Sequence, residues 1–345
     1  MEQEHKRRVR YKGTHPRSFQ EKYKELAPEK YGADIEKIIK SGKTPAGMHI
    51  PIMVDEILEV LDIQPGQVGY DATLGYGGHT RKMLERLQGQ GHLYATDVDP
   101  IESEKTRARL EDAGYGPDIL TIRRMNFADV DQVAPGVKFD FVLADLGVSS
   151  MQIDDPERGF TFKADGPLDL RLDPTSGVSA AERLRELDED ELAAMLVENS
   201  DEPYADRIAK AVMRVHQRGG SVDTTKQLAS IIEGALSFLS PAERKETVKK
   251  SCQRTFQALR IDVNSEFEVL YAFLDKLPTV LKSGGRAAIL TFHSGEDRLV
   301  KKAFKQHLRE GVYSDISEDV TRPSADECYR NPRAKSTKLR WAVRA

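Results

Sequence analysis

A regular alternation of short apolar segments with amphipathic ones most constrains the fold of this chain. The segments expected to form strands are 68–73, 92–97, 119–123, 139–145, 286–292, 313–316 and 339–343. Segments with helical spacing separate them, at 49–61, 78–87, 100–113 and 296–308. Strands that alternate with helices form a parallel sheet with helices on both faces. The sequence therefore predicts an α/β, Rossmann-like fold, closed by the last two strands as a hairpin.

A long interval interrupts this alternation between the fourth and fifth strands. It is far longer than a crossover connection needs. It begins with a Gly-, Asp- and Pro-rich loop at 151–177, and the helical patterns after that loop are 179–198, 203–217, 224–239 and 255–280. We predict three parts: a basic N-terminal extension at 1–47, partly helical at 18–40, a core of 48–150 and 255–345, and an inserted, mainly helical substrate-recognition subdomain at 151–254.

Charge is unevenly distributed along the chain. The formal net charge is −4, but segments 1–47 and 321–345 each carry a net +5, and 182–202 carries −7. Local basic segments are compatible with a nucleic-acid partner, although a solvated helix face explains any single one equally well. Cys252 and Cys328 have no metal-binding spacing, so no metal is expected. With no membrane span and no secretory signal, we expect a cytoplasmic protein; a homodimer is compatible with the sequence.

The loop after the first strand is rich in glycine, at Gly75, Gly77 and Gly78. Glycines let the backbone approach a ligand, and the N–H groups of the following helix face that ligand. The spacing is not GxGxxG, which disfavours a nicotinamide dinucleotide. Asp97 ends the second strand and suits the hydroxyls of a ribose, whereas Asp99 before Pro100 is placed to cap the next helix.

Three more side chains are expected at the same edge of the sheet. Phe127 follows the third strand, where it either packs on an adenine ring or belongs to the core. Asp145 emerges from the apolar fourth strand, and Gln152 follows it closely. Ligands of parallel sheets bind at the carboxyl ends of the strands, so these residues are candidates for a cofactor pocket.

Longer sequence strings resemble the RsmH (MraW) family of small-subunit ribosomal RNA cytosine-N4 methyltransferases. The strings are 49–51 (HIP), 71–79 (DATLGYGGH), 97–100 (DVDP), 145–155 (DLGVSSMQIDD), 157–160 (ERGF), 165–173 (DGPLDLRLD), 254–261 (RTFQALRI), 284–286 (GGR), 292–294 (FHS), 296–298 (EDR) and 331–333 (NPR). They cover about 48–345 in the family's order.

This resemblance implies a Rossmann-like methyltransferase fold that binds S-adenosylmethionine. It implies a cytosine N4 amine in the P-site region of 16S rRNA as the target, within the small ribosomal subunit. Gly77, Gly78 and His79 would line the methionine side, with Asp97 on the ribose. Phe127, Asp145 and Gln152 would complete the pocket.

Two acids are candidates for the catalytic contact to the target amine. We expect Asp145, with the carbonyl of Leu146, to accept hydrogen bonds from that amine. Asp169 is the second candidate, and a loop acid paired with Arg171 is an equal alternative. His79 and His293 invite catalytic roles, but a hydrogen-bonded structural role is the more common one for such histidines.

The target base must leave its stack to enter such a pocket. Phe160 is a candidate to stack on it, although aromatics in such loops more often anchor the loop. Arg254 is the better phosphate candidate, and Arg260 is either a second substrate contact or a buried ion-pair partner. The basic cluster Arg244, Lys245, Lys249 and Lys250 follows the RNA backbone or is a solvated face.

The chain departs from the family in two strings and in its basic N-terminal extension, which is longer than the family's usual start. Ser251, Cys252 and Gln253 replace a usual His-Pro-Ala, and Gly295 replaces a Leu in the His-Ser string. The alternatives to the rRNA assignment are a methyltransferase of another acceptor and a ribosome-assembly factor whose methylation is secondary. A dehydrogenase is the weakest alternative.

Overall fold

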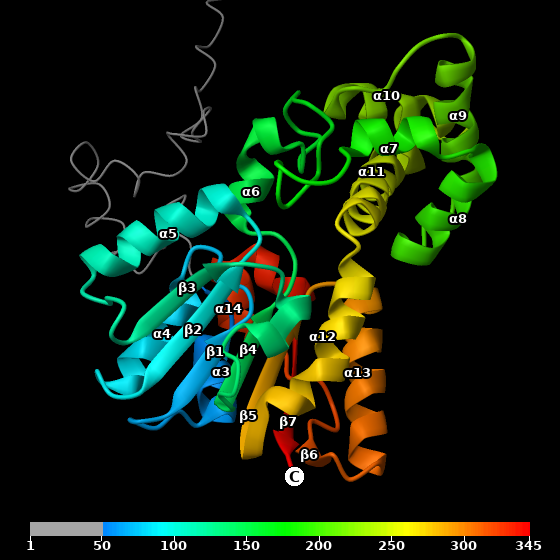
Figure 1. Ribbon diagram of the computed structural model, residues 1–345. Helices are drawn as coiled ribbons and strands as arrows, with labels where there is room; N and C mark the ends of the chain where they lie inside the picture. The colour runs from blue at the N-terminus through cyan, green and yellow to red at the C-terminus, as the bar shows by residue number, and fades with distance from the viewer. Residues whose placement is uncertain (1–50) are drawn as a thin grey trace, which may run out of the picture. The chain divides into compact units, whose positions relative to one another are not determined.

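The computed structural model describes residues 51–345 (Figure 1). The extension expected at 1–47, including its helix at 18–40, lies outside the described residues. Within 51–345, seven strands form one sheet in the order β3-β2-β1-β4-β5-β7-β6. The strands are β1 (Val68–Asp71), β2 (His92–Asp97), β3 (Leu120–Arg124), β4 (Phe139–Asp145), β5 (Leu281–Thr291), β6 (Tyr313–Ile316) and β7 (Lys338–Arg344).

The sheet is mainly parallel and ends in a hairpin, as the sequence predicts. Strands β1 to β5 are parallel, and β7 lies antiparallel between β5 and β6, which makes the expected hairpin. The order runs outward from β1 to β3 on one side and from β4 to β5 on the other. It therefore reverses between β1 and β4, where Rossmann-like sheets bind ligands. The α/β, Rossmann-like prediction is confirmed.

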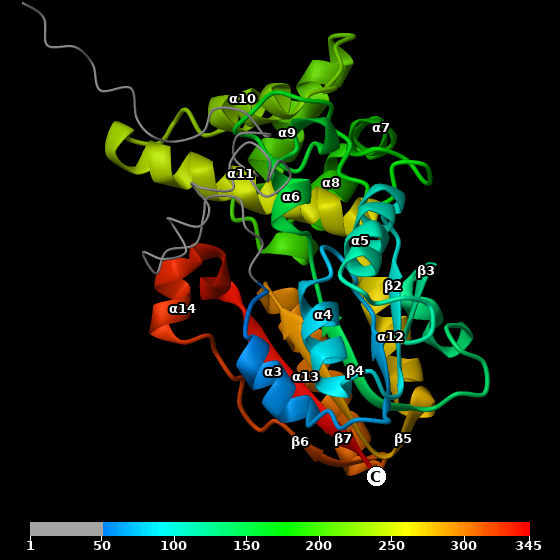
Figure 2. The same cartoon turned by 90° about the vertical axis from the view of Figure 1, so that its left-hand side faces the viewer.

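Helices cover both faces of the sheet (Figure 2). The helices on one face are α3 (Val54–Leu61), α4 (Gly78–Leu87) and α5 (Pro100–Asp112). The elements on the other are η2 (Phe127–Gln132), α12 (Glu266–Val280) and α13 (Ser294–Arg309). Along β4, Phe139 and Val142 join the second cluster while Phe141 and Leu143 join the first. The part of β4 that is buried on both faces, 141–144 (FVLA), is apolar at every position, as expected of a central strand.

Glycine at position 69 is required by its neighbour in the sheet. Gly69 on β1 pairs with Phe141 on β4, and a Cβ at Gly69 would lie 2.0 Å from the Phe141 ring. The ring therefore fills the space that a side chain on β1 would take. This packing brings β1 and β4 together at the point where the sheet order reverses.

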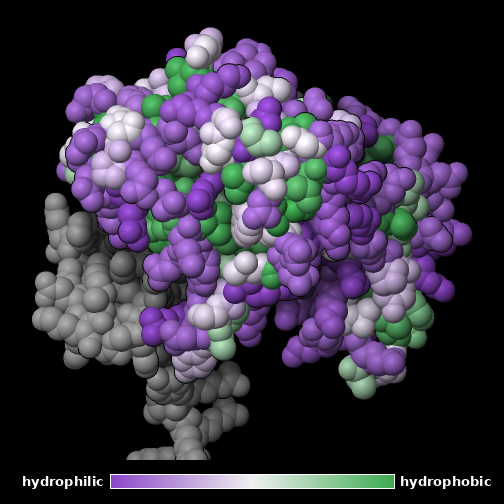
Figure 3. All heavy atoms as spheres, turned by 90° about the horizontal axis from the view of Figure 1, so that it is seen from below, coloured by the Kyte–Doolittle hydropathy of each residue, from purple (hydrophilic) through white to green (hydrophobic). Residues whose placement is uncertain are grey.

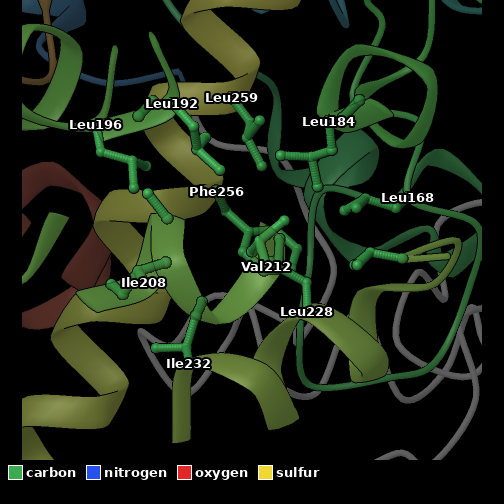
Figure 4. Close-up of a cluster of buried hydrophobic side chains, with 14 of the residues drawn as sticks. Leu168, Leu184, Leu192, Leu196, Ile208, Val212, Leu228, Ile232, Phe256 and Leu259 are labelled. Carbon is green, nitrogen blue, oxygen red and sulfur yellow. The ribbon is translucent and has the colours of Figure 1, made fainter. Parts of the chain in front are cut away.

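The interval after β4 forms a helical lobe. Its elements are α6 (Ser150–Asp154), η3 (Pro156–Arg158), α7 (Ala180–Glu186), α8 (Glu189–Ser200), α9 (Ala205–Gln217), α10 (Thr225–Ala235) and α11 (Pro241–Val263). Leucine, isoleucine and valine side chains from these helices point toward one another around Phe256 (Figure 4). The lobe thus has a hydrophobic core of its own, separate from the two clusters that flank the sheet.

Two helical segments differ from the sequence expectation. The 179–198 pattern is two helices, because Asp188 caps α8 in a reciprocal capping box with Glu191 and so ends α7. The 255–280 pattern lies on α11 and α12, which are separated at Asn264 and Ser265. Helix α11 crosses the expected domain boundary between 254 and 255 without a break. We place that boundary at Asn264.

The C-terminal part completes the core. Helix α14 (Ala325–Arg330) and η4 (Pro332–Ser336) lie between β6 and β7 in the chain. The backbone N–H of Met53 donates to Glu327 at 2.8 Å, which joins α14 to the start of α3. Seen from below, the molecule is mostly hydrophilic, with apolar residues in small interrupted groups (Figure 3). Among residues 51–345, no helix combines the length and the apolar character needed to cross a membrane.

Candidate active site

The loops after β1, β2 and β4 meet at the carboxyl edge of the sheet. The N–H of Gly75 donates to Asp97 Oδ2 at 2.8 Å, which joins the first loop to the end of β2. The N–H of Asp145 donates to Thr73 Oγ1 at 2.7 Å, which joins the same loop to the end of β4. The three loops predicted to form a cofactor pocket are therefore directly connected. We call this edge the mouth.

The glycine turn of the mouth is built for close approach. Gly77 has a left-handed backbone (φ 78°) directly before α4, and a Cβ there would lie 2.7 Å from Thr106 Cγ2. Thr106 in turn donates to the carbonyl of Gly75 at 2.6 Å. Helix α4 has no side-chain cap, so its first N–H groups are available to a ligand.

Asp97 is held in place by backbone donors. Its Oδ1 accepts from the N–H of Asp99 at 2.9 Å and its Oδ2 from that of Gly75. Burial raises the pKa of Asp97 to about 6, although these two hydrogen bonds lower it. Each carboxylate oxygen keeps a lone pair for a further donor, as a ribose hydroxyl requires.

Asp145 faces His79 across the mouth. Asp145 Oδ2 lies 3.3 Å from His79 Nδ1, and the side chain of Asp145 is 24% exposed. Its Oδ1 is buried and has no hydrogen-bond partner. Such an oxygen is rare in a folded protein and indicates a missing donor. Asp145 is therefore the one predicted catalytic acid that has unused capacity at the mouth.

Gln152 and Asp99 form a buried joint beside the mouth. Asp99 caps α5 as predicted, with Oδ1 accepting from the N–H groups of Ile101 and Glu102. Its Oδ2 accepts from Gln152 Nε2 at 2.8 Å and from Arg158 Nη1 at 2.7 Å. Gln152 Oε1 accepts from the N–H of Ser149, so both ends of this amide are used within the protein. Arg158, which is 8% exposed, was not predicted as a site residue from the sequence.

The two predicted aromatic contacts are both packed against the protein. Phe127 is partly buried, edge-on to Phe273 of α12 with ring centroids 5.2 Å apart. Phe160 is 8% exposed and belongs to the core of the helical lobe, and Phe162 beside it packs on Phe256. Phe160 therefore anchors its loop in the core of the lobe, which is the alternative given for it above.

Of the remaining predicted residues, Asp169 and Arg260 are paired within the protein, whereas Arg254 is not. Asp169 makes a bidentate pair with Arg171, at 2.7 and 2.8 Å, which is the alternative given for it above. Arg260 makes a bidentate pair with Glu266, at 2.7 and 2.9 Å, and is the ion-pair partner rather than a free cation. Arg254 is half-buried on α11 and makes no hydrogen bond or ion pair within residues 51–345.

A second charged cluster forms where the start of α12 meets the loop after β5, and it was not predicted from the sequence. Ligand atoms of Glu266, His293 and Glu296 all lie within 4.8 Å of one another. His293 Nε2 lies 3.2 Å from Glu296 Oε1, while Glu266 is paired with Arg260. Burial raises the pKa of Glu296, but the neighbouring His293 ring, the N–H of Phe292 and the charge of Arg260 outweigh burial and lower it. Within the cluster, Arg260 already balances the carboxylate of Glu266.

Comparison with known proteins identifies the family. The family model described as the MraW methylase family matches residues 46–345. The chain belongs to this family. The resemblance found from sequence strings is therefore confirmed, and with it S-adenosylmethionine as the cofactor.

Curated relatives extend this finding. The chain is 65% identical to "Ribosomal RNA small subunit methyltransferase H 1" of Agathobacter rectalis, over 100% of this chain and 99% of that one. It is 36% identical to "Ribosomal RNA small subunit methyltransferase H" of Acidobacterium capsulatum, over 85% and 97%. The first alignment includes the N-terminal extension, so that relative shares it. A solved S-adenosylmethionine-dependent O-methyltransferase of Thermotoga maritima aligns with a TM-score of 0.40 at 11% identity, over 90% of this chain and 71% of that one, too low to add to the strand order.

The residues of the mouth fit this cofactor. The glycine turn and the uncapped start of α4 suit its amino-acid end, since free N–H groups bind a carboxylate. Asp97 suits the ribose, and the unpaired oxygen of Asp145 shows that a donor is missing nearby. The cofactor assignments of Gly75, Gly77, Gly78, Asp97, Phe127 and Gln152 stay proposals. Those of His79 and Asp145 stay untested as well, and different roles are proposed for these two residues below.

The Asp99 joint gives a stability prediction. Arg158→Met leaves a fully buried carboxylate without its cation, and we expect the free energy of unfolding to fall by about 3–5 kcal/mol. Arg124→Met removes a half-exposed pair with Asp173 instead, and should cost about 1 kcal/mol or less. Urea denaturation of both variants measures the difference. Equal losses would contradict the structural role of Arg158.

The raised pKa of Asp97 predicts how cofactor binding depends on pH. A ribose hydroxyl donates to the ionised carboxylate, so S-adenosylmethionine affinity should fall as pH decreases below about 6, by up to about tenfold per pH unit. The stability of the protein without cofactor should depend on pH in the opposite direction. Because the pKa of Asp97 is raised in the folded state, this residue contributes to the free energy of unfolding at low pH, and that contribution is lost as pH rises through about 6.

Calorimetric titration over this pH range tests that prediction. Asp97→Asn should bind about 10–100-fold more weakly at pH 7 and lose the pH dependence. Asp112→Asn, an exposed acid at the end of α5, is the matched control and should keep the wild-type profile. An unchanged profile in Asp97→Asn would assign the pH dependence to another group.

Proposed function

We propose that this protein transfers the methyl group of S-adenosylmethionine to the exocyclic N4 amine of a cytosine in the P-site region of 16S rRNA, within the small ribosomal subunit. The family and the names of its relatives support a ribosomal RNA substrate. A substrate in the ribosome implies action in the cytoplasm. The observation that carries the amine target is Asp145, whose carboxylate ends β4 at the mouth with an unpaired oxygen.

The chemistry of an aromatic amine explains why an acid is needed there. The nitrogen lone pair of cytosine N4 is delocalised into the ring, so the amine is a poor nucleophile. When bound, S-adenosylmethionine supplies an activated methyl group, whose bond to sulfur breaks with the electron pair left on sulfur as nitrogen forms the new bond. Asp145 accepts a hydrogen bond from the amine and favours the positive charge that develops on nitrogen. The carbonyl of Leu146 is the second acceptor, and Asp169, paired with Arg171, is a weaker candidate for this role.

Asp145→Asn tests this assignment with little change of shape. Small subunits from cells lacking the gene are incubated with the enzyme and deuterated S-adenosylmethionine, and their nucleosides are mapped by mass spectrometry. We expect one N4-methylated cytosine at the P site with the wild type, and a rate at least about 100-fold lower with Asp145→Asn. Cofactor affinity should change by only a few-fold. Asp112→Asn serves as the control.

Parallel reactions on naked 16S rRNA and on cytosine-containing DNA separate the alternatives. Methylation of DNA alone would replace the rRNA assignment by another acceptor. A subunit that carries no new modification, but matures normally only when the protein is present, would indicate an assembly factor.

Helix α11 is the proposed RNA contact of the helical lobe. Lys245, Lys249 and Lys250 are exposed along it, and Arg254, about one turn after Lys250, is half-buried and has no partner within residues 51–345. Glu246 lies 3.7 Å from Lys250 and offsets that charge in part. Cations in a row on one helix suit a phosphate backbone, which supports a substrate-recognition role for the lobe.

Charge removal on α11 tests this contact. The triple variant Lys249→Ala, Lys250→Ala and Arg254→Ala should raise the KM for small subunits about tenfold or more while kcat changes little. The slope of log affinity against log salt should also decrease by about 2–3, since each lost phosphate contact contributes roughly 0.7–0.9. The control is the matched triple Lys301→Ala, Lys302→Ala and Lys305→Ala on exposed positions of α13. Equal effects in the two triple variants would show that the positive charge of the protein attracts RNA in general, and that α11 is not a specific RNA-binding site.

A further inference from the structure

His79 has a geometry that a passive core histidine does not need. Its ring is 8% exposed, and Nε2 lies 2.9 Å from the carbonyl oxygen of Ile52. A carbonyl only accepts hydrogen bonds, so Nε2 carries a proton. The other ring nitrogen, Nδ1, then faces Asp145 Oδ2 at 3.3 Å. Ile52 thus fixes the ring so that Nδ1 is presented to the carboxylate of the mouth.

A second proton must lie between the histidine and the acid. With Nε2 already protonated, an unprotonated Nδ1 would set its lone pair against a carboxylate lone pair. A proton at this contact makes the pair either imidazolium and carboxylate or imidazole and carboxylic acid. The geometry thus places one shared proton between His79 and Asp145.

The surroundings of His79 favour the imidazolium. Burial lowers the pKa of His79, but the hydrogen bond and charge of Asp145, the carbonyl of Ile52 and the charge of Asp71 outweigh burial and raise it. Asp71 ends β1 and is itself buried, held by Thr80 Oγ1 at 2.6 Å. The charged groups that act on the ring from β1 and β4 are both carboxylates, and α4 itself contributes Thr80 to hold one of them.

From this arrangement we propose that His79 is a positioning residue that holds the carboxylate of Asp145 facing the mouth. Because the shared proton stays on the imidazole of His79, the carboxylate of Asp145 remains able to accept a proton from the target amine. This inference rests on the proposed function and deepens it. After the methyl group has moved, the amine nitrogen carries a positive charge and one proton too many. That proton passes to the carboxylate of Asp145 and then to water, and His79 neither touches the substrate nor gives up its own proton.

Two substitutions separate the contacts of the ring. His79→Asn places an amide N–H near the position of Nδ1, so the donor to Asp145 remains while the titrating group is lost. His79→Gln places an amide N–H near the position of Nε2, so the contact to Ile52 remains while the donor to Asp145 is lost. We expect kcat to fall about tenfold in the first and roughly 100-fold in the second. The KM for small subunits should stay within a few-fold in both.

A readout without catalysis tests the pair itself. In protein with ¹⁵N-labelled histidine, the His79 imidazole signals are identified by their loss in His79→Gln and followed against pH. We expect a raised pKa in the wild type and a clear fall in Asp145→Asn, which has no carboxylate to share the proton. His92→Gln, at the half-buried start of β2, is the control for assignment. An unchanged titration of His79 in Asp145→Asn would overturn the proposal.

Cofactor binding provides the remaining outcome. S-adenosylmethionine should bind His79→Gln within a few-fold of the wild type by calorimetry. A loss of binding as large as the loss of kcat would overturn the proposal and make His79 a cofactor ligand. If instead no substrate is methylated by the wild type, the proposed function fails, yet the titration and the calorimetry still decide whether His79 and Asp145 act as a pair.

Discussion

The buried carboxylate of Asp99 is the interaction on which the geometry of the mouth depends. An ionised carboxylate with no solvent contact is tolerated only when donors surround it. Two of its donors are N–H groups of α5, and the other two come from Gln152 and Arg158 in the segment after β4. The start of α5 and the segment after β4 are therefore fixed to each other. These two segments lie beside Asp97 and Asp145, so one carboxylate sets the separation between the proposed ribose contact and the proposed amine contact.

The same segment carries this constraint on to the helical lobe. Arg158 also donates to the carbonyl groups of Arg171 and Leu172. Asn264, at the break between α11 and α12, accepts from the N–H of Leu172 and donates to the carbonyl of Leu170. Across that break, Arg260 of α11 pairs with Glu266 of α12. The orientation of α11 relative to the sheet thus follows from the same chain of contacts that shapes the mouth. Helix α11 is proposed to hold RNA while a base enters the mouth. Because the same contacts position both, they fix the distance between the RNA contact on α11 and the mouth.

Much of the fold could be predicted from the sequence, because local patterns encode it. Strands β2, β4 and β6 and helix α4 have the bounds that periodicity and turn residues indicate, and the caps at Asp99 and Pro100 lie where expected. What the sequence did not show depends on contacts between distant positions. Gln152 and Arg158 meet Asp99 across 53 and 59 residues, and nothing local in either string indicates a partner for it. A helix-spaced run such as 179–198 also looks continuous until the competing cap at Asp188 is considered. The site residues found by reasoning on strand ends, Asp97 and Asp145, are those whose position follows from topology alone.

The two string departures from the family's pattern, at 251–253 and at Gly295, each contact a neighbouring side chain away from the mouth. Ser251 is fully buried and donates from Oγ to Glu202, a buried acid of the helical lobe, at 2.9 Å. Gly295 lies against the ring of Phe267, and a Cβ at 295 would come within 2.6 Å of it, so the bulky aromatic and the glycine are matched to each other. Neither substitution contacts Asp97, Asp145 or His79. Both are exchanges of packing inside the lobe and at the start of α13. His79, Asp97 and Asp145 all lie within the strings that resemble the family, so neither departure changes the residues proposed for the chemistry of the mouth.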